Sequence, residues 1–219
     1  MRRIGMHSAF LLIGLLGLGC AAASGQADAA RAISRTDVAL SFYGAFSGTT
    51  TGNGVAQSPS NAAGGMVEVR HIANPILGFG VTYSYNRANE VYNPTEYACP
   101  GGAVPTCNPP PTAIVPANAH EITGDWVPSV TLANFRPFAV LGIGLLLNVP
   151  AGGQASASTD TKAVYVYGAG LDWGLAPHIG LRLQYRGNLY QAPDVTQLYT
   201  STKAFTHTSE PMIGAYFRF

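Results

Sequence analysis

Charged residues are scarce in this chain. They make up 11% of its 219 residues, whereas soluble domains typically contain about 25%. The formal net charge is only +1. The chain therefore lacks the basic surplus of a nucleic-acid-binding protein, and no nucleic acid partner is predicted.

Apolar runs long enough to cross a membrane as a helix are also missing. The segment Ala9–Gly19 follows Arg2 and Arg3 and holds eleven mostly apolar residues, whereas a spanning helix needs about 18 to 20. Small residues follow at 21–30, which is the order of a secretory signal peptide.

Export divides the chain into three expected parts. Cleavage after Ala23 or Ala27 is expected, so we assign 1–27 to the signal peptide, 28–35 to an N-terminal periplasmic segment and 36–219 to the mature domain. Cys20 leaves lipidation open as an alternative, because Leu16–Cys20 is roughly of lipobox type. The exported chain is either a soluble all-β domain or a transmembrane barrel.

Cysteine is rare as well. After cleavage only Cys99 and Cys107 remain, in a loop rich in Pro and Gly. Because exported proteins mature in an oxidising compartment, we predict a disulfide between them. A metal site is a weaker alternative, since no His or second Cys pair lies at ligand spacing. No cofactor is predicted.

What the chain does contain is alternation of apolar with small or polar residues. Eight segments show this strand pattern: 36–46, 63–72, 78–88, 119–128, 136–148, 161–174, 179–191 and 207–219. In 179–191, for example, Leu181, Leu183 and Tyr185 share one face, and Arg182 and Arg186 share the other. The pattern predicts an all-β fold of eight strands.

The connections between these segments alternate in length. Long connections are expected at 47–62, 89–118, 149–160 and 192–206, and short ones at 73–77, 129–135 and 175–178. This alternation is typical of an eight-stranded antiparallel up-and-down transmembrane β-barrel, with long loops outside the cell and tight turns in the periplasm. Strands of about ten residues are long enough to span the membrane.

Alternation alone does not say which face is inside, and a soluble lipocalin-like barrel would show the same period. The polar faces, however, hold many Gly, Ser and Thr but few charges, as a narrow lumen requires. Aromatic residues gather near the strand ends, as in interfacial girdles. These features favour the membrane barrel.

The last segment ends in an aromatic residue. Tyr216, Phe217 and Phe219 form an ending that we interpret as a signal read by the barrel-assembly machinery. An exposed strand of this kind would invite aggregation in a soluble protein, but it is a suitable closing strand for a barrel in lipid.

The inward face of the predicted barrel collects charged residues. They are Glu68, Arg70, Glu121, Asp125, Asp172, Arg182, Arg186, Glu210 and Arg218. Side chains fill the interior of an eight-stranded barrel, and buried charges must pair because isolated ones are costly. We expect a salt-bridged plug, with a gated narrow pore as the alternative.

Two stretches carry a resemblance to a known family. Tyr167–Arg186 and the ending Gly214–Phe219 resemble the last two hairpins of OmpA-type barrels, the outer-membrane protein β-barrel domain family. The resemblance implies eight antiparallel strands, a polar interior, and a luminal arginine at the position of Arg182 that switches partners. It carries over no wall-tethering role, because a peptidoglycan-binding domain is not expected after the barrel.

One pair of residues suggests chemistry. His207 and Ser209 have the spacing of a His-x-Ser pair found in barrel enzymes that act on lipid A acyl chains, and a base beside a hydroxyl is the minimum for an activated nucleophile. Glu210 replaces the asparagine that follows the pair in that family. We therefore favour a polar rim and predict no enzymatic activity.

The expected protein is thus a monomeric barrel of the Gram-negative outer membrane, with a structural, surface-interaction or narrow-pore role. Its expected partners are membrane lipids, lipopolysaccharide and the barrel-assembly machinery. The long loops, whose composition suits weakly ordered surface, could contact an extracellular ligand.

Overall fold

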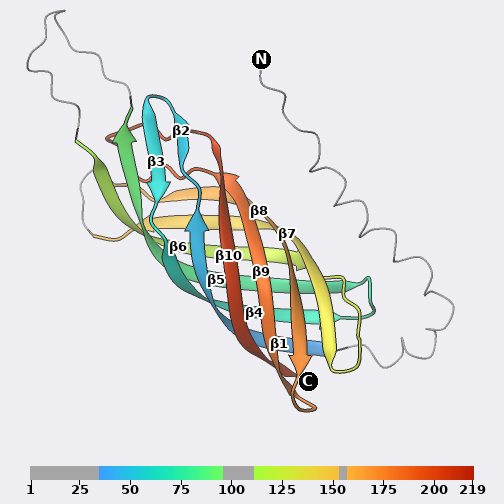
Figure 1. The fold of residues 1–219 in the computed structure, drawn as a ribbon. Helices are drawn as coiled ribbons and strands as arrows, with labels where there is room; N and C mark the ends of the chain where they lie inside the picture. Colours follow the sequence, from blue (N-terminus) through green and yellow to red (C-terminus); the bar gives the residue numbers. More distant parts are fainter. Residues whose placement is uncertain (1–34, 96–110, 153–156) are drawn as a thin grey trace, which may run out of the picture.

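A computed structural model describes residues 35–95, 111–152 and 157–219 of the chain. In these ranges the chain forms strands only (Figure 1), and no helix there is long and apolar enough to cross a membrane. The strands are β1 (Arg35–Ser47), β2 (Thr50–Gly52), β3 (Val55–Pro59), β4 (Ala62–Ile72), β5 (Gly78–Pro94), β6 (Ala113–Trp126), β7 (Phe135–Pro150), β8 (Asp160–Gly174), β9 (Ile179–Gln191) and β10 (Phe205–Arg218).

Eight of these strands close into a barrel. Each of β1 and β4 to β10 pairs antiparallel with its neighbour along the chain, and β10 returns to pair with β1. The β5–β6 pairing completes the circle. The predicted eight-stranded antiparallel up-and-down barrel is therefore confirmed, and β2 and β3 form an additional hairpin outside it.

The strands are steeply staggered around the barrel. One circuit of paired residues that starts at Asp37 on β1 returns to β1 at Ser47, ten residues further along the strand. The intermediate positions are Arg70, Gly80, Asp125, Gly142, Val166, Asn188 and Thr208. With eight strands, such a stagger requires a tilt of about 40° and leaves an interior that side chains can fill.

The two faces of the barrel have the polarity of a membrane protein. Large apolar side chains point outward and are exposed, for example Phe42, Ile143 and Leu183, whereas the inward positions hold buried polar and charged groups. A soluble barrel would reverse this arrangement, so the lipocalin-like alternative is wrong. Lipid, rather than water, suits the outer face.

The short connections lie at the end of the barrel that carries the C-terminus (Figure 1). They span 73–77, 127–134 and 175–178, close to their predicted positions. Trp126 anchors one of them, because its indole N–H donates to the Ile76 carbonyl at 2.7 Å. In outer-membrane barrels the short turns face the periplasm, and we name this the periplasmic end.

The opposite end is more ordered than the sequence suggested. The connection 47–62, predicted to be weakly ordered surface, contains the β2–β3 hairpin, and β3 pairs with the upper part of β5. Strands β5 and β6 also extend well into the predicted connection 89–118. Cys99 and Cys107, the predicted disulfide, lie outside the described residues.

The hairpin takes part in a small apolar core at this extracellular end. Its buried members are Val55, Tyr92, Ala113, Val115 and Val195, which come from β3, β5, β6 and the connection 192–204. The side-chain amide of Gln57 donates to Glu90 at 3.2 Å and to the Pro193 carbonyl at 2.7 Å. We call this assembly of β2, β3, the upper part of β5 and β6, and 192–204 the cap.

Candidate functional site

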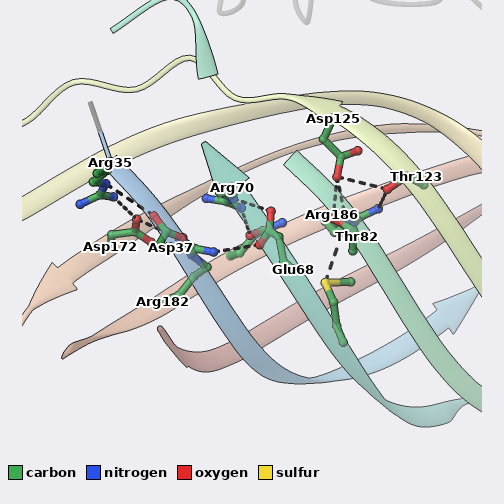
Figure 2. A network of polar contacts seen from close by, with 12 residues as sticks. Arg35, Asp37, Glu68, Arg70, Thr82, Thr123, Asp125, Asp172, Arg182 and Arg186 are labelled. Carbon is green, nitrogen blue, oxygen red and sulfur yellow. Dashed lines mark hydrogen bonds and ion pairs between the residues drawn. The ribbon is translucent and has the colours of Figure 1, made fainter. Parts of the chain in front are cut away.

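The lumen contains two clusters of charged side chains, shown side by side in Figure 2. Alternation places every second residue of a strand inside the barrel. Residues close to the periplasmic ends of β1, β4, β8 and β9 form the lower cluster. Residues of β5, β6 and β9 form the upper cluster.

Arg182 is the centre of the lower cluster. Its guanidinium donates to Asp172 at 2.7 and 3.1 Å, to Asp37 at 2.8 Å and to Glu68 at 2.9 Å. Arg35 adds a further bond to Asp172 at 3.0 Å. Arg182 has no exposed surface, so three carboxylates replace the water that a free guanidinium would bind.

Arg70 joins this cluster through a carboxylate, an amide and an aromatic ring. It donates to Glu68 and, at 2.7 Å, to the Gln184 side chain. Its guanidinium lies 4.1 Å from the centre of the Phe138 ring, a cation–π arrangement. Gly170 makes room for this ring, because a methyl group at Gly170 would collide with it.

The upper cluster is built around Arg186. This arginine donates to Glu121 at 2.9 Å and to Thr123 at 3.2 Å, and lies 3.6 Å from Asp125. Thr82 and Thr123 both donate to the Asp125 carboxylate, at 2.7 and 3.1 Å. Like Arg182, Arg186 has no exposed surface.

A cavity of about 40 Å³ separates the upper cluster from the cap. Glu90, Glu121 and Glu210 contribute carboxylates to its lining. Glu210 is 2% exposed, and one of its oxygens has no hydrogen-bond partner among the described residues. A space of this size holds a few water molecules at most.

The structure places eight of the nine predicted luminal residues inside the barrel, all of them buried. The ninth, Arg218, was assigned wrongly to the ion-pair network. It lies at the periplasmic mouth and donates to the Pro177 carbonyl, at 2.7 and 3.1 Å, instead of to a carboxylate. Its position at the end of β10 brings it beside the turn 175–178.

Three luminal residues were missed by the sequence reasoning, namely Arg35, Asp37 and Arg136. Asp37 is fully buried and contacts Arg182. It precedes Ala39 and Ser41 on the same face of the first segment, so extending the alternation by one step would have identified it. Arg136 lies four residues before Val140 on β7, so the alternation places both side chains inside the barrel.

His207 and Ser209, the pair suggested for catalysis, each contact a different tyrosine hydroxyl. His207 lies 2.8 Å from the Tyr167 hydroxyl, and Ser209 lies 3.1 Å from the Tyr185 hydroxyl. Among the hydrogen bonds of the described residues none joins His207 to Ser209. In the structure each of the two side chains is therefore hydrogen-bonded to a tyrosine and not to the other.

The residues of the predicted assembly signal point in two directions. Phe217 and Phe219 are exposed on the outer face, where they pack edge to face with 5.1 Å between ring centres. Tyr216 is buried in the lumen, and the centre of its ring lies 5.3 Å from the Arg182 guanidinium. The strand end thus contributes to both the lipid-facing surface and the lower cluster.

Comparison with known families decides the assignment. Residues 13–206 match the model of the outer membrane protein beta-barrel domain. The chain belongs to this family. It is an outer-membrane protein of the Gram-negative type, its lumen is filled with polar and charged groups, and the membrane lipids are its surroundings. No curated protein sequence matches it significantly.

Solved structures share the fold of this family member. Neisserial surface protein A has a TM-score of 0.56 and 13% identity, over 84% of this chain and 97% of that one. OprG from Pseudomonas aeruginosa has a TM-score of 0.54 and 10% identity, over 85% and 96%. At these identities the likeness is one of fold.

Proposed function

We propose that this outer-membrane barrel is closed in its resting state and serves the envelope as a structural element and a surface-contact protein. The observation that carries the proposal is the complete burial of Arg70, Arg182 and Arg186. These side chains point toward the barrel axis, where a water-filled pore would leave them solvated. Above them the cap buries Gln57 and Tyr92 as well.

Single-channel recording in planar lipid bilayers tests the closed state. The wild-type protein should show no steady conductance, whereas Arg182→Ala, which leaves the carboxylates of Asp37, Glu68 and Asp172 to repel one another, should show brief openings. Arg87→Ala, at an exposed position of β5, is the matched control. A steady ohmic current through the wild-type barrel would refute closure and favour the pore. Unchanged recordings for Arg182→Ala would exclude gating by this residue.

Surface contact is the second part of the proposal. The cap presents Leu198, and the adjoining first residue of β10 presents Phe205, as exposed apolar residues at the extracellular end. Exposed apolar groups on a rigid support favour protein contact. Binding of intact cells to immobilised host-matrix proteins, compared with cells lacking the 192–204 connection, measures this role.

Lipopolysaccharide and the barrel-assembly machinery complete the proposed partners, and the barrel is proposed to be a monomer.

We also propose that the barrel has no enzymatic activity. The separate hydrogen bonds of His207 and Ser209 support this, because a nucleophile needs its base within reach. Incubation with lipid A followed by mass spectrometry of released fatty acids tests it. Release of fatty acid that is lost in Ser209→Ala would establish an acyl hydrolase instead.

The processing of the chain belongs to the same proposal. We propose removal of 1–27, a short periplasmic segment at 28–35, a barrel over 36–219, and a disulfide between Cys99 and Cys107. N-terminal sequencing of the mature protein and its mass before and after reduction and alkylation test these points. A start other than residue 28, or alkylation of both thiols without reduction, would contradict them.

A further inference from the structure

The periplasmic mouth of the barrel holds a pocket of about 320 Å³ with an unusual lining. Three arginines, Arg35, Arg136 and Arg218, line it together with Tyr216 and residues of the turns around 131–135 and 174–177. Among the lining residues that belong to the described part of the chain there is no Asp or Glu. The pocket therefore collects positive charge at the end of the lumen.

Two of these arginines lack a carboxylate partner in the described part of the chain. Arg136 is 4% exposed; its Nε donates to the Ser129 hydroxyl at 2.9 Å, and its buried Nη2 has no hydrogen-bond partner. Arg218 donates only to the Pro177 carbonyl. Arg35 differs, because it contacts Asp172 at 3.0 Å and Asp37 at 3.5 Å.

The nearby carboxylates do not offset these charges. Asp37 and Asp172 already bind Arg182, and Glu68 binds both Arg70 and Arg182. Among the described residues, the mouth and lower cluster thus contain five arginines and three side-chain carboxylates. Arg136 is a buried cation without a counter-charge, which is unfavourable, and Arg218 adds a second positive charge at the half-exposed mouth. The two surplus charges point to an anion that the pocket receives.

We propose that the pocket at the periplasmic mouth binds a phosphate group. The planar guanidinium forks of Arg136 and Arg218 suit the oxygens of a tetrahedral oxyanion, and such charge-assisted bonds are short and strong. The phosphate comes either from free inorganic phosphate or from a phospholipid headgroup of the periplasmic leaflet. Phe135 and Leu175, which line the pocket and are exposed on its rim, would contact the acyl chains of such a lipid.

The test uses the full-length mature protein, refolded into phosphate-free maltoside micelles for the first arm and into phosphatidylcholine nanodiscs for the second. In one arm the protein is titrated with inorganic phosphate by calorimetry. In the other, native mass spectrometry counts phosphatidylglycerol molecules retained from mixed nanodiscs. Arg136→Gln and Arg218→Gln should each weaken phosphate binding or lipid retention about tenfold, as expected for the loss of one charge-assisted contact.

Arg87→Gln is the matched control, because it removes an exposed arginine in the middle of β5, a strand that does not line the pocket, and it should change neither reading. Slower migration of unboiled samples would reveal a variant that fails to fold, and Arg136→Lys, which keeps the charge, should retain most of the binding. Binding of free phosphate alone assigns a soluble ion, and retention of lipid alone assigns a headgroup. Absence of both, or equal losses in Arg87→Gln, would overturn the proposal.

Discussion

At the scale of single residues, the luminal arginines differ in their partners. Arg182 contacts three carboxylates, Arg186 two, and Arg136 none in the described part of the chain. An arginine that satisfies several carboxylates at once holds several strands together. These differences assign a structural role to Arg182 and Arg186 and leave Arg136 available for a ligand.

Gly170 shows how a small residue supports this arrangement. Its missing side chain leaves room for the Phe138 ring and for the Leu183 carbonyl, and Arg70 packs on that ring. Gly170→Ala should destabilise the barrel by about 1–3 kcal/mol, the usual cost of overpacking. Urea unfolding in detergent measures the change.

Gly124→Ala is the control for that substitution, since no atom lies within 4 Å of the added methyl group. Its stability should stay near that of the wild type. Equal stability of the two variants would show that the Phe138 ring moves aside, and that its contact with Arg70 is adaptable.

At the scale of elements, the β2–β3 hairpin depends on a two-residue turn. Gly52 pairs with Val55, and the intervening Asn53 and Gly54 have φ angles of 52° and 71°. Asn-Gly suits this left-handed geometry. Gly54→Ala should weaken the hairpin by about 1 kcal/mol because a side chain is strained there.

Hydrogen exchange of the amides of 50–59 measures this effect, which should appear as faster exchange in the hairpin and unchanged exchange in β9. Gly48→Ala is the control, because its added methyl group would make only an ordinary van der Waals contact. Faster exchange in both variants alike would contradict a specific role for the turn.

The cap should also respond to pH. Glu90 lies above Tyr85, the last lipid-facing aromatic residue of β5, and its outward neighbours Arg87 and Asn89 are polar, so it is outside the membrane. Burial raises the pKa of Glu90 to about 7. Between pH 4.5 and 7 the folded cap holds a proton that the opened cap releases, so its stability falls as pH rises through this window.

Hydrogen exchange at pH 5.5 and 8, corrected for the intrinsic rates, tests this expectation. The amides of β3 and of the upper part of β5 should be less protected at pH 8 in the wild type. Glu90→Gln carries no charge at either pH and should remove the difference. A difference that persists in Glu90→Gln would assign the pH response to another group.

The elements also show how far sequence reasoning reached. Strict alternation located all eight barrel strands, because the membrane imposes one polarity on each face. The hairpin was missed although Asn53-Gly54 is a strong turn signal, since the Gly- and Ser-rich composition of 47–62 hid the short strands around it. The division into two clusters could not be predicted either, because it depends on stagger, which relates residues on strands far apart in the sequence.

At the scale of the whole molecule, the closed hydrogen-bonded circle of strands predicts resistance to denaturation by detergent. Unheated protein should migrate faster on a dodecyl sulfate gel than boiled protein, because the intact barrel is more compact than the unfolded chain. Gly170→Ala should lose the fast-migrating form at a lower temperature than the wild type. Identical migration with and without heating would argue against a closed barrel under these conditions.

The lumen is electrically uneven along its axis. Among the described residues, the mouth and lower cluster hold two more arginines than side-chain carboxylates, whereas the upper cluster and the cavity above it hold one arginine, Arg186, and the carboxyl groups of Glu90, Glu121, Asp125 and Glu210. Regions of opposite net charge that follow one another along a pore let ions pass more easily in one direction than in the other. A variant in which the clusters were opened should therefore rectify, passing more current at one polarity of voltage than at the other.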